Sequence, residues 1–345
     1  RNNNRRVRRN HIRTRIDPMN EFNKREFRAR FRFHKDEVGY LYHLIDGPRT
    51  LDPIVIRRNF TLPGITRLLI ALRFYAIGTF YQAIGDLFGV TRDTVQKSVF
   101  DVSYLIASKL RNRFISLPRT PQEILNAKSE FMRLSGFPLC IAAVDGTHVL
   151  IQSYEGHDAE IYRNRKMTFS HNCQVAVSAD DRVLDIVSRW PGSAHDSTIF
   201  THSNMYRRFS FGAFGDSSVV VADSAYPPNY FICKPLETVD SVGKQNYQYC
   251  QIKTRNVVER VNGQLKRRFA ILRMGLRFKT NKIAQDIVVS CCILHNLRKE
   301  FDQKPKHYTP LEQRQQIEIS EHFQQHAQHS QQIRLQNYLI DNYFQ

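Results

Sequence analysis

The sequence predicts an α/β domain preceded by a helical domain, and three observations support this prediction. From about residue 36 to 117, apolar residues recur at spacings of three and four, which is the period of an amphipathic helix. Beyond Pro138 the pattern changes to short apolar runs typical of β-strands, and helical spacing returns near residue 256. The chain has 345 residues, 41% of them hydrophobic, which is enough for a sizeable core and about two domains.

The first 35 residues form a basic arm. Its arginines and lysines are Arg5, Arg6, Arg8, Arg9, Arg13, Arg15 and the run from Lys24 to Arg32. One interpretation is a solvated tail; the other is a nucleic-acid-binding or nuclear-targeting arm whose arginines neutralise phosphates. The whole chain carries 51 Lys and Arg against 32 Asp and Glu, a net charge of +19, which favours nucleic acid over an anionic membrane as partner. We expect no membrane insertion, because no uncharged apolar run approaches the roughly 18 to 20 residues needed to cross a bilayer.

The helical domain, residues 36–117, contains a candidate helix-turn-helix at about 79–110. A short helix ends at Gly89, and Thr91 is suited to cap a second helix that runs toward Leu110. In that arrangement Arg92, Gln96 and Lys97 lie at the start of a recognition helix and are candidates for DNA contact. The alternative is an ordinary helical hairpin.

The α/β domain is predicted to span residues 118–302, followed by a Gln- and His-rich C-terminal tail, 303–345. Thr120 to Glu123 has the pattern of a capping box with proline at the first helical position. Strand-like segments follow at Cys140–Val144, His148–Ile151, Asn172–Ser178, Val183–Arg189 and Ser218–Ala222, and helices at about 256–273 and 281–300. The tail is expected to be a surface helix or disordered.

Three aspartates stand where apolar runs stop. Asp145 and Asp223 each follow a strand-like segment directly, and Asp196 follows the segment that ends in Trp190 to His195. A carboxylate at the end of a buried strand costs desolvation free energy unless a cation compensates it. A metal site is therefore one interpretation; taken singly, Asp145 and Asp223 also suit a turn.

A fourth acid, Glu259, lies on a predicted helix beside an apolar stripe and near Lys266. The stripe consists of Val258, Val261, Leu265, Phe269 and Leu272. Carboxylates from separate elements suit Mg²⁺ or Mn²⁺, and two such ions can stabilise both oxygens of an in-line displacement at phosphorus. The alternative for Glu259 alone is a surface ion pair with Lys266 or Arg255.

Five short blocks occur in a fixed order between about residues 140 and 300. They are Ala143–His148, Pro191–Ser197, Ala222–Pro227, Val257–Lys266 and Cys292–Asn296. In composition and order these blocks resemble those of the PIF/Harbinger DDE transposases and of the domesticated nucleases derived from Harbinger transposases. The resemblance implies an RNase H-like fold, a mixed five-stranded sheet flanked by helices, preceded here by an all-α domain with the helix-turn-helix.

The resemblance also implies a catalytic triad that binds divalent metal. Asp145 matches its first Asp and Glu259 its Glu. For the second Asp we expect Asp223, because it ends the fourth strand and leaves 35 residues before Glu259 (259 − 223 − 1). Asp196 is then an auxiliary acid or a cap of a helix over Thr198–Phe209. His148 and His195 are expected near the site as auxiliary structural or phosphate contacts.

A metal-dependent DNA endonuclease or transposase of the DDE type is the function that this resemblance implies. It would cut phosphodiesters with two Mg²⁺ or Mn²⁺ ions and, as a transposase, join 3′-OH ends to target DNA. Backbone contacts are expected from Lys266, Arg267 and Arg268, with Lys166 and Arg165 as weaker candidates. The alternatives are a catalytically silent, transposase-derived DNA-binding or scaffold protein and an RNA-processing nuclease.

The expected partners follow from the same resemblance. They are double-stranded DNA, either transposon terminal repeats or a target site, a Myb/SANT-like accessory protein and a second copy of this chain. The expected location is the nucleus, with the cytoplasm as a further compartment.

Overall fold

The structure, a computed structural model, describes residues 16–51, 53–57, 60–154, 157–278, 280–302, 310–327 and 335–345. Residues 1–15 of the predicted basic arm lie outside the described residues. The chain divides into two compact units, residues 1–103 and 104–345. This division falls inside the helix that ends at Phe114, whereas the sequence analysis placed the domain boundary after residue 117.

The first unit is mainly helical. Its elements are α1 (Pro18–Glu21), α2 (Lys24–Phe31), α3 (Lys35–Leu44), α4 (Gly47–Thr50), β1 (Ile54–Arg57), β2 (Phe60–Leu62), α5 (Gly64–Ile77), α6 (Tyr81–Phe88) and the first part of α7 (Arg92–Phe114). The antiparallel pair β1 and β2 was not predicted, although its β-branched Ile54-Val55-Ile56 run is a strand signal. Part of the predicted basic arm is also folded, because Phe27 and Phe31 of α2 are buried.

Helices α6 and α7 are joined by a tight turn. Gly89 ends α6 with a φ of 64°, and the Thr91 hydroxyl accepts a hydrogen bond from the Thr94 N–H at 3.3 Å. A Cβ on Gly85 would lie 2.6 Å from the Val90 carbonyl oxygen, so this close approach of α6 to the turn requires glycine. The use of this pair as a DNA-reading helix-turn-helix stays a prediction.

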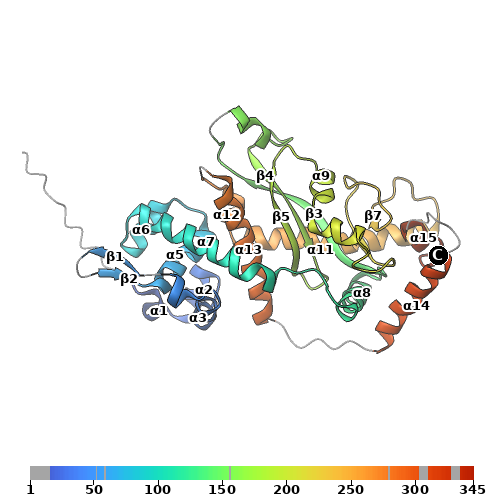
Figure 1. The fold of residues 1–345 in the computed structure, drawn as a ribbon, viewed down its shortest axis with the longest axis horizontal. Helices are drawn as coiled ribbons and strands as arrows, with labels where there is room; N and C mark the ends of the chain where they lie inside the picture. Colours follow the sequence, from blue (N-terminus) through green and yellow to red (C-terminus); the bar gives the residue numbers. More distant parts are fainter. Residues whose placement is uncertain are drawn as a thin grey trace, which may run out of the picture. The chain divides into compact units, whose positions relative to one another are not determined.

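The second unit is built on a five-stranded mixed sheet (Figure 1). Its strands are β3 (Cys140–Leu150), β4 (Ser170–Val177), β5 (Val183–Pro191), β6 (Val219–Val221) and β7 (Ile232–Cys233), in the spatial order β5-β4-β3-β6-β7. The first three strands form an antiparallel meander, and β6 and β7 add in parallel beside β3. This order agrees with an RNase H-like sheet, and β7 is a strand that the sequence analysis did not assign to residues.

Helices flank this sheet (Figure 1). The helices of this unit after α7 are α8 (Pro121–Ser135), the 3-10 helix η1 (His157–Tyr162), α9 (Asp196–Thr201), α10 (Asn204–Ser210), α11 (Val242–Arg268), α12 (Ile271–Met274), α13 (Asn281–Asp302), α14 (Pro310–Ala327), which packs on α8, and α15 (Leu335–Asn342). The predicted capping box of α8 is present, since Thr120 and Glu123 exchange side-chain to backbone hydrogen bonds. The apolar stripe predicted on α11 and α12 is buried, as expected.

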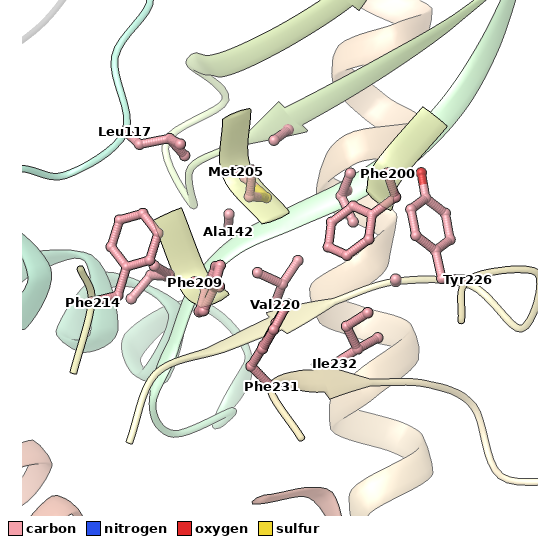
Figure 2. Close-up of a cluster of buried hydrophobic side chains, with 14 residues drawn as sticks. Leu117, Ala142, Phe200, Met205, Phe209, Phe214, Val220, Tyr226, Phe231 and Ile232 are labelled. Atoms are coloured by element: carbon pink, nitrogen blue, oxygen red, sulfur yellow. The ribbon is translucent and has the colours of Figure 1, made fainter. Parts of the chain in front are cut away.

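Two apolar layers cover the sheet. One contains the α11 stripe, and the other is an aromatic cluster in which α9 and α10 pack on β3 and β6 (Figure 2). In the cluster Phe209 stacks on Phe231 with ring centroids 4.3 Å apart. Five of the six cysteines are buried, and Cys250 is half-buried. In the part of the chain that the structure describes, no helix is long and apolar enough to cross a bilayer.

Candidate active site

Asp145 and Asp223 lie beside each other at the place where β6 ends. Val221, the last residue of β6, is paired with Ala143, so Asp223 follows two residues later alongside Asp145. Asp145 is inside β3, opposite Val175 of β4, which corrects the expectation that its strand stops there. The strand continues because β4 pairs with β3 as far as Leu150, whereas β6 leaves the other edge of Asp145 open.

The two carboxylates repel each other in a partly buried place. Burial and then the charge of Asp223 raise the pKa of Asp145 to about 6. Burial is also the main cause that raises the pKa of Asp223, with Asp196 adding to it and the Ala225 N–H, 3.0 Å from Asp223 Oδ1, opposing it. Raised pKa values in a group of acids mark a place where negative charge lacks sufficient compensation.

Asp196 lies next to Gly146, on the face of β3 opposite to the Asp145 side chain. Its Oδ1 accepts a hydrogen bond from Asn172 Nδ2 at 2.7 Å, and a Cβ on Gly146 would lie 2.6 Å from that oxygen. Asp196 is the first residue of α9, and its carboxylate is not the helix cap, because the N-cap residue is His195. The predicted helix over Thr198–Phe209 is in fact two helices, with Ser203 capping the second.

The Tyr226 hydroxyl is a further member of this group, and the sequence analysis missed it. It is buried and, among the described residues, has no hydrogen-bond partner. Burial and then the charges of Asp196, Asp145 and Asp223 raise its pKa. The ring packs edge-on against Phe200 with centroids 5.4 Å apart (Figure 2). The position of Tyr226 three residues after Asp223 was the only available signal.

Glu259 shares one face of α11 with Gln251 and Arg255, because these three residues follow one another at intervals of four. Gln251 Nε2 donates to the Ala222 carbonyl oxygen at 2.8 Å and so fixes α11 to the end of β6. Further along this face Arg255 and Lys266 lie on either side of Glu259, and both contribute electrostatically to the Asp145 site. The Glu259 carboxylate itself is 46% exposed and pairs with Arg255 at 2.9 Å. Its predicted place beside Asp145 and Asp223 is therefore not shown by the structure.

The oxygen atoms at this place fit a hard divalent cation by their chemistry. Asp145 and Asp223 offer carboxylate oxygens with raised proton affinity, and the buried Tyr226 hydroxyl has no partner among the described residues. In the described ranges, however, no three His, Cys, Asp or Glu side chains are close enough together to hold one metal ion.

The predicted basic and histidine contacts divide into two sets. Near the carboxylates, Lys266 is half-buried and both His148 and His195 are exposed. His148 Nδ1 lies 2.9 Å from Ser170 Oγ. His195 Nδ1 lies 2.8 Å from Arg165 Nη2. Arg267 is exposed, but Arg268 lies 3.3 Å from His295 Nδ1 on α13. In the first unit Arg92 and Lys97 are exposed and Gln96 is partly buried. The structure places these last three in the other compact unit.

One known family matches much of the second unit. Residues 144–296 match the family described as DDE superfamily endonuclease, so this segment is similar to the DDE superfamily endonucleases. The match contains Asp145, Asp196, Asp223 and Glu259 and covers the β3 to α13 part of the structure.

Several curated proteins are similar to this chain over most of its length. The protein named "Putative nuclease HARBI1" from Rattus norvegicus is 28% identical over 266 residues, 76% of this chain and 74% of its own length. Its Xenopus laevis counterpart is 28% identical over 273 residues, 78% and 77% of the two chains. "Protein ALP1-like" from Arabidopsis thaliana is 22% identical over 307 residues, 83% and 74%. These matches confirm the resemblance to Harbinger transposase-derived nucleases, whereas no solved structure gives a significant match.

Proposed function

We propose that this protein is a metal-dependent DNA endonuclease of the DDE type that hydrolyses phosphodiester bonds. The observation that carries the proposal is the juxtaposition of Asp145 and Asp223 at the open end of β6, within a segment similar to the DDE superfamily endonucleases. Two partly buried carboxylates with raised pKa values are suited to bind a divalent cation. Mg²⁺ or Mn²⁺ bound there would supply charge neutralisation at the scissile phosphate.

The residues around the two aspartates have separate roles in this proposal. Asp145 and Asp223 hold the metal, and Asp196, fixed by Asn172, adds negative charge from the other side of β3. Glu259 completes the triad by leaving Arg255. Surface ion pairs at this helical spacing contribute only about 0.3–0.5 kcal/mol, and the Glu259 side of this pair is 46% exposed, so the carboxylate can leave Arg255. Lys266 and Arg267 contact the DNA backbone beside the carboxylates.

Further parts of the proposal are supported only by the family resemblance and by the net charge of +19. They are double-stranded DNA as substrate, joining of 3′-OH ends to target DNA, and a nuclear location. A Myb/SANT-like accessory protein and a homodimer belong to the same set. Arg92, Gln96 and Lys97 at the start of α7 are proposed to read the DNA sequence.

A catalytically silent DNA-binding protein is the second candidate. It is favoured by the Glu259 carboxylate, which pairs with Arg255 instead of Asp145 and Asp223. The two candidates share the fold and the basic surface, and they differ in whether bound metal leads to cleavage.

The test is nicking of supercoiled plasmid DNA by the full chain in Mg²⁺ or Mn²⁺. We expect Asp145→Asn and Asp223→Asn each to reduce cleavage by about 10²-fold or more, because each removes a charge that the metal requires. The cleavage rates of Glu259→Gln and Asp196→Asn show whether the third metal-binding acid is Glu259 of α11 or Asp196 of α9. Asp216→Asn, an exposed aspartate seven residues before Asp223, is the matched control and should cleave normally.

Two further results separate the candidates. Mn²⁺ binding, followed by calorimetry without DNA, should weaken in Asp145→Asn and Asp223→Asn. DNA binding by the intact chain without cleavage in either metal contradicts the nuclease and supports the silent DNA-binding protein.

A further inference from the structure

The turn from Asn164 to Thr168 joins η1 to β4 and has an unusual residue at its third loop position. The Asn164 N–H donates to the Thr168 carbonyl oxygen and the Met167 N–H to the Asn164 carbonyl oxygen, both at 2.9 Å. This is a three-residue hairpin loop whose last residue takes the left-handed conformation, a position that glycine normally occupies. Here it is Met167, with a φ of 61°.

Hydrogen bonds from the flanking residues hold the backbone of this turn. The buried Asn164 side chain accepts from the Lys166 and Thr168 N–H groups at 2.9 and 3.1 Å, and its Nδ2 donates to Ser170 Oγ at 3.0 Å. Arg163 lies over the Phe169 ring and donates to the Met167 carbonyl oxygen at 3.2 Å. The Met167 side chain takes no part in this and is 68% exposed.

The same turn lies beside the carboxylates. Arg165 Nη2 is 2.8 Å from Nδ1 of His195, the residue before Asp196. Burial lowers the pKa of both His148, on β3, and Lys266, on α11, and the nearby charge of Lys166 lowers both further. Both Arg165 and Lys166 are exposed. The turn therefore presents two cations and one apolar side chain next to the place where cleavage is proposed.

We propose that this turn is a DNA-contacting element in which Met167 packs against a base near the scissile phosphate while Arg165 and Lys166 contact the flanking phosphates. The inference rests on the proposed function for its substrate, DNA. Positive side chains neutralise phosphates, and an exposed apolar side chain such as Met can insert between base steps and unstack them. A non-glycine residue held in the left-handed region at an exposed tip is a strain that an external contact can explain.

The test uses the full chain in EDTA with DNA duplexes that carry 2-aminopurine in place of adenine at successive positions. Unstacking of a base raises 2-aminopurine fluorescence. We expect a rise with the wild-type chain at a limited set of positions, and loss of this rise with Met167→Gly and Met167→Ala. The DNA dissociation constant should increase about tenfold in both variants. Leu311→Ala on α14, where Leu311 is 76% exposed, is the control for loss of an exposed apolar side chain.

Three results decide the inference. Met167→Gly should melt at the same or a higher temperature than the wild type, because glycine accepts the left-handed backbone, so weaker binding cannot be due to misfolding. Arg165→Gln and Lys166→Gln should each reduce the slope of log affinity against log salt by about one unit. Unchanged fluorescence and affinity in Met167→Gly overturn the inference.

The inference about Met167 and the proposed nuclease function can fail independently of each other. A wild-type chain that shows the Met167-dependent fluorescence rise but never cleaves DNA in Mg²⁺ or Mn²⁺ contradicts the nuclease and supports the inference. A wild-type chain that cleaves without any fluorescence rise supports the nuclease and overturns the inference.

Discussion

The turns at the two ends of β4 have the same backbone hydrogen bonds and a left-handed residue at the same position, but their side chains have different surroundings. In the turn from Ser178 to Arg182, the Ser178 N–H donates to the Arg182 carbonyl oxygen at 2.9 Å, and Asp181 has a φ of 66°. The turn from Asn164 to Thr168 has the same bonds, with Met167 in the equivalent position. Aspartate visits the left-handed region more readily than methionine does.

The Asp181 side chain is held by neighbouring helices, whereas the Met167 side chain is exposed. Asp181 accepts hydrogen bonds from Arg260 and Gln264 on α11, at 2.6 and 3.0 Å, and lies 3.4 Å from Lys299 on α13. Met167 projects into solvent. The Asp181 turn therefore ties the sheet to two helices and contributes stability, whereas the Met167 turn costs stability and offers a surface for contact.

The largest effect expected from this comparison is a loss of stability in acid at the Asp181 turn. His295 Nε2 donates to the Asp181 carbonyl oxygen at 2.8 Å, while Nδ1 faces Arg268, and Lys299 is also near. Burial lowers the pKa of His295 to about 4 from 6.5. Because the unfolded chain takes up this proton near pH 6.5 and the folded chain only near pH 4, stability falls as the pH drops through this window, by about 3 kcal/mol.

Urea unfolding between pH 7 and pH 4 measures this effect. A His295→Gln variant cannot titrate at this position and should show a shallower dependence of the unfolding free energy on pH. Equal slopes for the two chains would contradict the lowered pKa of His295 in the folded chain.

The second expected effect is a loss of stability in Asp181→Gly. Glycine suits the backbone, but the change leaves Arg260, Gln264 and Lys299 without their shared carboxylate. We expect the free energy of unfolding to fall by about 2 kcal/mol, less than for a fully buried pair because Arg260 is partly exposed. Asp181→Asn, which keeps the side-chain oxygen, should lose less in the same urea titration. An unchanged midpoint in Asp181→Gly would mean that these contacts contribute nothing.

The smallest expected effect has the opposite sign. Met167→Gly removes the strain of a left-handed non-glycine residue and should raise the free energy of unfolding by about 1 kcal/mol. Thermal melting of the two glycine variants side by side gives the comparison directly. A melting temperature that falls in Met167→Gly would show that the Met167 side chain stabilises the fold, and the contrast between the two turns would then be lost.

The strands β3 to β6 and the aspartates that follow apolar runs could be predicted from local pattern, whereas the five-stranded mixed order was expected only from the family resemblance. The apolar runs before Asp145 and Asp223 are strands that neighbours bury on both sides, and the α11 stripe keeps a helical period. Strand β7 could not be predicted because Ile232 and Cys233 form only two residues of pairing, which no periodicity reveals. The β1 and β2 pair was missed because its short β-branched run stood among helical spacings.

The contacts inside the site were less predictable because they join residues distant in sequence. Asn172 holds Asp196 across 24 residues, and nothing in either local sequence indicates that pair. The position of Arg255 one helical turn before Glu259 made their ion pair foreseeable, and it was among the alternatives considered. The burial of the Tyr226 hydroxyl among the aspartates depends on how Phe200 and the strands pack, which composition does not encode.

The C-terminal helix α15 covers the β7 edge of the sheet. The predicted tail contains α14 and α15 in its described parts, and Leu335, Tyr338 and Leu339 of α15 are buried. The Leu335 N–H donates to the Tyr230 carbonyl oxygen at 3.3 Å, and the Gln336 side chain accepts from the Lys234 N–H at 3.1 Å, so α15 covers both ends of edge strand β7. An uncovered edge strand is a template for pairing with another chain. Truncation before Leu335 should therefore produce aggregation-prone protein even though the carboxylates lie elsewhere on the sheet.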